Sequence, residues 1–311
     1  MSAATPAWSL ADIPDLTGRT VVVTGPSAGG LGWYTALELA RRGARVVLAG
    51  RTPARLAEAA AGLRAELGAP DLVELVVDLS SLTSVREGAA RAADLGPIDV
   101  LVNNAGVMGT PYGRTADGLE QQMATNHFGP FLLTGLLWPQ LVDGGGRVVN
   151  LASNMHRVAR RAPLDDPRRQ ERRYARWSVY GETKLANLLF AYELDRRARA
   201  AGAPVLALAT HPGFAGTHLA ANGQYGRARG GVASILDAGI RAISQSAAAG
   251  AWPTLMAATA DLPGATYCGP AGLGEMSGPA TIVTSSRLSH DPSAQRRLWE
   301  ISEDVTGVRY P

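Results

Sequence analysis

Short, continuous runs of branched apolar residues recur along the first two thirds of the chain, and an amphipathic segment follows each run. Because the apolar residues do not alternate with polar ones, the predicted strands are buried on both faces, which is typical of a parallel sheet with crossover helices. The predicted strands span residues 20–25, 44–50, 72–79, 98–106, 146–153 and 204–213, and the predicted helices span 31–43, 53–67, 81–95, 116–140 and 178–201. Repeated strand–helix units predict an α/β fold built on a doubly wound parallel sheet.

These units form one domain, because no Pro/Ser-rich linker and no internal repeat divides the 311 residues. We expect a short N-terminal extension over 1–17 and a single domain over 18–311, with a small C-terminal substrate lobe over about 214–311. A final helix is predicted over 290–307, with a capping aspartate near its start and a glycine after its end.

Cysteine content, charge and hydropathy restrict the cellular compartment and the partners expected for the protein. A single thiol, Cys268, cannot form an internal disulfide, so a reducing compartment fits, and a small buried residue is expected there rather than a nucleophile. The first residues lack the pattern of a signal peptide, and no apolar run approaches the roughly 18 residues that span a membrane. We therefore expect a cytoplasmic protein. A net charge of +3 is too small to indicate nucleic-acid binding by itself.

A glycine-rich turn, TGPSAGGLG (24–32), connects the first predicted strand to the first predicted helix. Glycines at this place let the backbone approach a pyrophosphate and direct helix N-terminal amides toward it. The alternative is a plain tight turn, but the position in the first βαβ unit favours dinucleotide binding and a Rossmann-like fold. The second strand ends in LAGRT, with Arg51 at its tip and no acidic residue. This favours NADP over NAD, unless Arg51 is simply one more solvated arginine.

Lys184 is the only lysine among 30 basic residues, and it follows Tyr180 by four positions. On a helix these two side chains share one face. A tyrosine hydroxyl has a pKa of about 10, and a nearby ammonium lowers that value toward the range of a useful acid or base. A compact ammonium also suits a ribose hydroxyl where a flat guanidinium fits poorly. Chance could place the one lysine here, but the pairing favours a catalytic role.

Several motifs occur in one order along residues 19–217: TGPSAGGLG, VDL (77–79), NNAG (103–106), TNHFG (125–129), NLAS (150–153), YGETK (180–184) and HPG (211–213). In this combination the sequence resembles the short-chain dehydrogenase/reductase family, and the long stretches around NNAG and YGETK resemble its retinol-dehydrogenase-like branch. The resemblance implies an enzyme that acts on CH–OH or C=O groups by hydride transfer with a nicotinamide cofactor, NADP by the argument above and NAD less so. A small-molecule substrate is implied, of a lipophilic kind.

The resemblance also assigns roles to individual residues. Tyr180 would be the general acid or base, Lys184 would lower its pKa and hold the nicotinamide ribose, and Ser153 would bind the substrate oxygen. Asn126 would hold the helix geometry and a water in a proton relay. Asp78 would meet the adenine and the 212–213 stretch the nicotinamide carboxamide. The implied cofactor contacts are Gly25, Ser27, Gly30, Leu31, Gly32, Arg51, Asp78, Leu79, Asn104, Ala105, Gly106, Tyr180, Lys184, Pro212, Gly213 and Thr217. His127 and His211 are expected to be structural hydrogen-bonding residues, and no metal is implied.

The sequence departs from the family pattern in its glycine turn. The turn is one residue longer than usual, and Pro26 has no N–H to offer a phosphate. Gly30 and Gly32 are expected to take the roles of the last two glycines.

The second departure is an insertion over 154–179, in which residues 157–176 hold eight arginines against three acids, with Tyr174 and Trp177 among them. It could cover the active site and contact substrate, form a basic patch for nucleic acid or a membrane surface, or be a solvated, internally paired loop. In the lobe, residues 224–231 are expected to form a mobile lid, and a helix over 232–248 either lines an apolar pocket or packs on a second subunit in a homo-oligomer.

The intact set of Tyr180, Lys184, Ser153 and Asn126 favours an enzyme. The alternative is a non-catalytic NADP-binding sensor of the same fold, and a further one is a binding protein that uses the arginine-rich insertion for nucleic acid.

Overall fold

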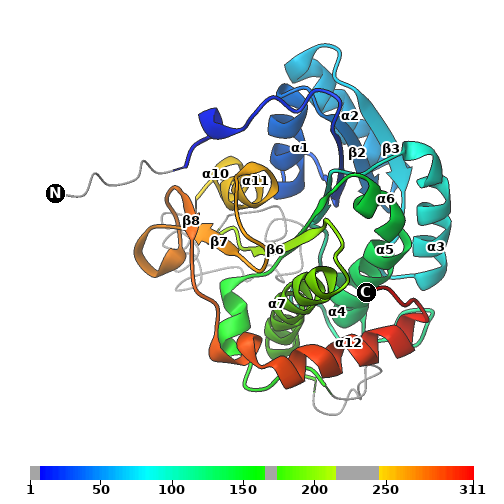
Figure 1. Cartoon of the computed structure of the whole chain (residues 1–311), viewed down its shortest axis with the longest axis vertical. Helices are drawn as coiled ribbons and strands as arrows, with labels where there is room; N and C mark the ends of the chain where they lie inside the picture. Colours follow the sequence, from blue (N-terminus) through cyan, green and yellow to red (C-terminus); the bar gives the residue numbers. More distant parts are fainter. Residues whose placement is uncertain (1–7, 165–173, 215–244) are drawn as a thin grey trace, which may run out of the picture.

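The computed structural model describes residues 8–164, 174–214 and 245–311. Within them an eight-stranded sheet has the order β3-β2-β1-β4-β5-β6-β7-β8, which Figure 1 shows at the centre of the molecule. The strands are β1 (Thr20–Thr24), β2 (Arg45–Gly50), β3 (Leu72–Val76), β4 (Val100–Asn103), β5 (Arg147–Leu151), β6 (Leu206–Thr210), β7 (Tyr267–Pro270) and β8 (Ala280–Ile282). All neighbours pair in parallel except β7 and β8, which are antiparallel. The predicted doubly wound sheet is confirmed, and its antiparallel edge was not predicted.

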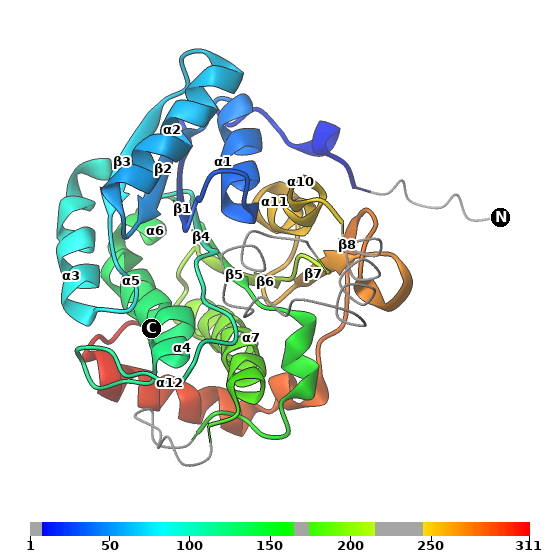
Figure 2. The same cartoon turned by 180° about the vertical axis from the view of Figure 1, so that it is seen from behind.

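Helices cover both faces of this sheet (Figure 2). The α-helices are α1 (Leu31–Arg41), α2 (Pro53–Leu67), α3 (Leu82–Arg91), α4 (Gln121–Met123), α5 (Gly129–Leu136), α6 (Trp138–Asp143), α7 (Arg176–Ala200), α10 (Ala247–Gly250), α11 (Trp252–Thr259) and α12 (Pro292–Thr306). Short 3₁₀ turns, η1 (Leu10–Asp12), η2 (Ala93–Leu95), η4 (Asn154–Val158), η6 (Leu273–Glu275) and η7 (Arg287–His290), lie between them. None of the helices in the described ranges combines the length and apolarity that crossing a bilayer requires.

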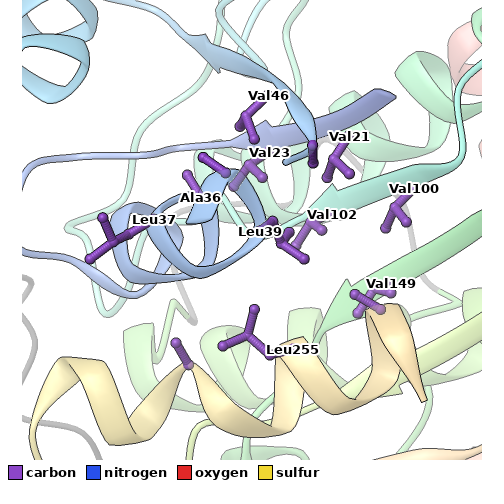
Figure 3. Close-up of a cluster of buried hydrophobic side chains, with 14 of the residues drawn as sticks. Val21, Val23, Ala36, Leu37, Leu39, Val46, Val100, Val102, Val149 and Leu255 are labelled. Atoms are coloured by element: carbon purple, nitrogen blue, oxygen red, sulfur yellow. The ribbon is translucent and has the colours of Figure 1, made fainter. Parts of the chain in front are cut away.

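Successive residues of each strand supply two separate cores. Val21 and Val23 of β1 point toward α1, α2 and α11, in the cluster of Figure 3. Val22 points the other way, toward the core that α3, α5, α6 and α7 cover. All three valines are fully buried, which explains why the predicted strands read as unbroken apolar runs.

The predicted helix over 116–140 is interrupted. It begins only at Gln121, where the Glu120 carboxylate accepts hydrogen bonds from the amides of Gln122 and Met123, both 2.8 Å. A π-turn follows, η3 (Ala124–Phe128), and then α5 and α6. Pro130 has no N–H to bond the carbonyl four residues earlier, so the backbone cannot continue as a regular α-helix there.

The last helix, α12, was predicted correctly with its caps. Asp291 accepts a hydrogen bond from the amide of Ser293 at 2.9 Å, and Gly307 ends the helix at φ 68°. The helix packs across α7, with the Arg197 guanidinium 4.6 Å from the Trp299 ring centroid (Figure 1). The predicted lid over 224–231 and most of the predicted helix over 232–248 lie outside the described residues.

Candidate active site

A cavity of about 420 Å³ opens where the strand order reverses, between the carboxyl ends of β1 and β4. In doubly wound sheets this is the position at which nucleotide ligands bind. It is lined by Gly25, Pro26, Ser27, Gly30, Leu31, Gly32, Ala49, Gly50, Arg51, Thr52, Arg55, Leu56, Val77, Asp78, Leu79, Asn104, Ala105, Gly106, Val107, Thr125 and Leu151. The residues proposed from the sequence for the pyrophosphate and adenosine end therefore lie in one cavity.

The glycine turn fits closely against the loop that follows β4. Gly25 has φ +68°, and a Cβ on it would lie 2.9 Å from the Cα of Ala105. A Cβ on Gly32 would overlap the side-chain amide of Asn104, which donates a hydrogen bond to the Thr24 carbonyl at 2.7 Å. At both positions only glycine fits, so the backbone borders the cavity without a side chain between.

The extra residue of the turn is accommodated by a short hydrogen-bonded loop. The amide of Gly30 donates to the carbonyl of Ser27 at 2.8 Å, and Gly29 between them has φ +69°. Helix α1 then begins with Gly30 as its N-cap and no side-chain cap. The first amides of α1 are thus available to an anion in the cavity, as the sequence predicted.

Two arginines border the cavity at the start of α2. Arg51 and Arg55 are exposed, and Thr52 between them makes no side-chain cap to the helix. Sequence reasoning selected Arg51, which precedes the N-cap of α2, and missed Arg55 in the first turn of that helix. On the neighbouring strand end, Asp78 accepts hydrogen bonds from the amide and hydroxyl of Ser80 at 2.9 and 2.7 Å.

Tyr180 and Lys184 lie on α7, both buried, with 8% and 3% of their surface exposed. The Lys184 ammonium donates a hydrogen bond to the Leu151 carbonyl at 2.9 Å and lies 5.6 Å from the centroid of the Tyr180 ring. Leu151 and Gly106 both line the cavity, and a Cβ on Gly106 would lie 3.6 Å from the Lys184 Nζ. Lys184 and Tyr180 themselves are not among the residues that line the cavity. Burial lowers the pKa of Lys184 to about 8.

Asn126, in the π-turn, joins the loop after β4 to α7. Its Oδ1 accepts a hydrogen bond from the Val107 amide at 2.7 Å. Its Nδ2 donates to the Val107 carbonyl at 2.9 Å and to the Thr183 hydroxyl at 3.0 Å. Because Thr183 directly precedes Lys184, Asn126 holds the geometry of the helix at the site, as predicted. Its part in a proton relay stays a prediction.

Ser153 follows β5, the neighbour of β4, and the 212–213 stretch follows β6, the next strand along the sheet. Ser153 is half-buried after β5, and its hydroxyl accepts a hydrogen bond from the Met155 amide at 3.2 Å. Gly213, with φ +65°, follows β6 and packs on the Met276 carbonyl, 2.5 Å from where its Cβ would be. Neither of them, nor Pro212, lines the cavity described above. Thr217 lies outside the described residues.

An aromatic hollow of about 570 Å³ lies beside Tyr180, lined by Pro111, Tyr112, Tyr174, Ala175, Arg176 and Trp177. The Trp177 ring stands at 89° to that of Tyr180, with 6.4 Å between the ring centroids. Of the predicted insertion, residues 165–173 lie outside the described residues. Its described end therefore contributes the aromatic side chains that the sequence singled out, and Trp177 packs beside Tyr180.

Three further sequence predictions are settled by burial and hydrogen bonds. His127 and His211 are structural, because His127 Nε2 lies 2.8 Å from the Ser302 hydroxyl and His211 Nδ1 accepts from the Gly213 amide at 3.2 Å. Cys268 is fully buried in β7, and burial raises its pKa to about 12, so it is no nucleophile.

Comparisons with known proteins agree with this geometry. Residues 19–163 match the family described as short chain dehydrogenase. Human retinol dehydrogenase 12 is 35% identical over 305 residues, which cover 95% of this chain and 88% of that protein. The chain belongs to the short-chain dehydrogenase family. The resemblance stated from the sequence motifs, including the retinol-dehydrogenase-like branch, is confirmed.

Two other proteins extend the comparison. Human retinol dehydrogenase 13 is 44% identical over 213 residues, which cover 68% of this chain but only 62% of that protein. A crystal structure of an uncharacterised protein from Mycobacterium Paratuberculosis is 39% identical, covers 98% of this chain and 100% of that one, and superposes with a TM-score of 0.79. The family binds a nicotinamide cofactor. Membership of the family does not distinguish NAD from NADP.

Proposed function

We propose that this protein is an NADP-dependent oxidoreductase that transfers a hydride between the nicotinamide and an alcohol or carbonyl substrate, with Tyr180 as the proton-transferring group. The observation that carries the proposal is the buried Lys184 ammonium, 5.6 Å from the centroid of the Tyr180 ring and hydrogen-bonded to the carbonyl of Leu151, a residue that lines the cavity. A sensor that only bound the nucleotide would not need a buried charge beside a phenol.

The residues of the cavity fit a dinucleotide. Gly25 and Gly32 leave no room for side chains, the uncapped start of α1 offers amides to a pyrophosphate, and Arg51 with Arg55 offers charge to a 2′-phosphate. When bound, the nicotinamide ring supplies a hydride to a carbonyl or accepts one from an alcohol.

The chain's own side chains manage the proton and orient the substrate. In reduction Tyr180 donates its phenolic proton to the carbonyl oxygen, and in oxidation it accepts the hydroxyl proton. The positive charge of Lys184 stabilises the phenolate form of Tyr180. Ser153, at the end of β5, donates a hydrogen bond to the same substrate oxygen and so fixes its position.

A lipophilic substrate is supported by the aromatic hollow beside Tyr180. Tyr112 and Tyr174 contact each other edge to face at 5.4 Å between ring centroids, and Trp177 stands next to the catalytic ring. Such walls favour apolar or planar groups. The retinol dehydrogenases among the relatives are named for a substrate of that character.

The proposal is tested by mixing the protein with NADPH and a panel of aldehydes and ketones and following NADPH absorbance. We expect turnover in the natural sequence, and a loss of about 100-fold or more in Tyr180→Phe, with NADPH affinity retained. Phenylalanine keeps the ring and removes only the hydroxyl. Tight NADPH binding with no turnover across the panel would contradict the enzyme and favour the sensor.

A further inference from the structure

The turn between β7 and β8, residues 272–276, carries a non-glycine residue in an unfavourable backbone conformation. Gly274 and Glu275 have φ of 62° and 57°, and the Glu275 amide closes the turn on the Gly272 carbonyl at 2.9 Å. Left-handed backbone disfavours a side chain at this position. The Glu275 carboxylate contacts Arg157 and His211.

The carboxylate of Glu275 contacts two segments that end neighbouring strands. One oxygen accepts a hydrogen bond from the Arg157 guanidinium at 3.3 Å, four residues beyond Ser153. The other lies 3.0 Å from Nε2 of His211, the residue that follows β6. Both of these latter atoms are buried, and neither makes a hydrogen bond within the described residues, so their 3.0 Å approach is a polar contact without hydrogen-bond geometry. This contact places the carboxylate oxygen beside the imidazole nitrogen.

His211 transmits this contact to the backbone beyond β6. Its Nδ1 accepts the Gly213 amide at 3.2 Å, which leaves the ring proton on Nε2, facing Glu275. The ring is fully buried and neutral, because burial lowers the pKa of His211 to about 3. It fits only because Gly269 has no side chain, since a Cβ there would overlap the imidazole.

The backbone of the same turn also forms hydrogen bonds with the segment after β6 and with the segment after Ser153. The Met276 carbonyl accepts a hydrogen bond from the Phe214 amide at 2.8 Å. The Asn154 side chain donates to the carbonyls of Gly274 and Glu275 at 3.3 and 3.4 Å. A single turn thus sets the distance between the residues that follow Ser153 and those that follow His211.

We propose that Glu275 is a positioning residue that, through His211 and the Gly213 amide, fixes the 212–213 peptide for the nicotinamide end of the cofactor. This rests on the proposed function, in which that peptide meets the nicotinamide. Through Arg157 the same carboxylate also holds the segment after Ser153 in place relative to the 212–213 peptide. Glu275 touches neither cofactor nor substrate and acts only through these neighbours.

The test compares two ligands by calorimetry: NADPH, and 2′-phospho-ADP-ribose, which lacks the nicotinamide. We expect Glu275→Ala to weaken NADPH binding about tenfold, the loss that accompanies one hydrogen bond to a charged group, and to leave binding of the fragment within about twofold. Glu275→Gln, which can still accept from His211, should recover most of the affinity. The control is Glu300→Ala, which removes an exposed carboxylate paired with Arg297 and should change neither ligand.

Equal weakening of both ligands in Glu275→Ala would show a general loss of structure and overturn the inference, as would no change for NADPH. If the alanine variant does not fold, Glu275→Asp takes its place, since a shorter carboxylate leaves His211 unpartnered and predicts the same selective loss. If the natural sequence binds neither ligand, the proposed function fails first, and this outcome is separate from a failure of Glu275 alone.

Discussion

At the scale of single residues, the surroundings of Lys184 explain why one lysine stands in a chain of arginines. The ammonium lies in a slot with 3% of the residue exposed, bounded by the Leu151 carbonyl and by Gly106. A guanidinium would bring five donors into a space in which the ammonium bonds the Leu151 carbonyl. The sequence alone singles out Lys184, because every other basic residue is an arginine. The space around its ammonium could not be predicted, because it is formed by segments that are distant in the chain.

We expect Lys184→Arg to lower kcat/KM by about 100-fold or more, because the charge is kept but cannot occupy the same slot.

In the natural protein, kcat/KM should fall as the pH rises through about 8, where the buried ammonium loses its proton. A profile of kcat/KM in the reducing direction between pH 6 and 10 measures this. A rate that stays level to pH 10 would contradict it.

In the proposed function, Arg51 and Arg55 at the start of α2 give the preference for NADP. Replacing Arg51 and Arg55 together by alanine should weaken NADPH binding at least about tenfold and leave NADH binding unchanged, since only the former has a 2′-phosphate. Arg64→Ala, an exposed arginine in the last turn of the same helix, is the matched control. Equal effects on both cofactors would place the arginines away from the 2′-phosphate. Arg55 could not be singled out from the sequence, because the chain contains many arginines and nothing in the local pattern distinguishes this one.

At the scale of elements, the long strands and capped helices were predictable and the short or interrupted ones were not. Strand β7 has four residues and β8 has three, too few for hydrophobic periodicity to show. The break in the predicted helix over 116–140 is signalled by Pro130 and Pro139, each at the start of a helical segment. The π-turn itself follows from contacts of Asn126 with residues 107 and 183, which no local pattern contains.

The contact between the glycine turn and the loop after β4 predicts the effect of a single methyl group. In Gly32→Ala the new Cβ would lie 2.8 Å from the Gly25 carbonyl and overlap Asn104, so α1 must shift away from the turn. We expect a loss of about 1–3 kcal/mol in the free energy of unfolding and weaker NADPH binding, measured by urea denaturation and calorimetry. Gly113→Ala is the control, because a Cβ on Gly113 would have nothing within 4 Å of it. Unchanged cofactor affinity in Gly32→Ala would contradict the assigned pyrophosphate site.

At the scale of the whole molecule, three buried histidines tie distant elements together in their neutral form. Burial lowers the pKa of His127 and His211 to about 3 and that of His156 to about 4. His156 donates from Nδ1 to the Ser153 carbonyl at 2.6 Å and accepts at Nε2 from the Ser286 amide at 3.0 Å. These bonds join parts of the chain that sequence reasoning could not connect, because it assigned His127 and His211 only a general structural role and His156 none.

The free energy of unfolding should therefore depend on pH. In the unfolded chain each histidine takes up a proton below about pH 6.5, while in the folded protein it does so only near pH 3 to 4. The stability is complete above pH 6.5 and decreases as the pH falls below it, by about 1.4 kcal/mol per pH unit for each histidine.

Urea denaturation at pH 7 and pH 5, above the range in which most carboxylates titrate, measures this decrease. His156→Asn should reduce the dependence of the unfolding free energy on pH by the contribution of one histidine. Equal stability at the two pH values would show that the three imidazoles already carry protons in the folded state.

The position of α12 has a consequence for biosynthesis. Trp299 of that helix packs on Arg197 of α7, and Ser302 contacts His127 of η3. The half of the sheet that borders the glycine turn is complete once β4 has been made, so it can fold while the ribosome is still translating. The helix that bears Tyr180 and Lys184, in contrast, gains its packing against α12 only after residues 292–306 have been made. A nascent chain stalled before that point could already form the cavity at the glycine turn and would still lack the helix that packs on α7.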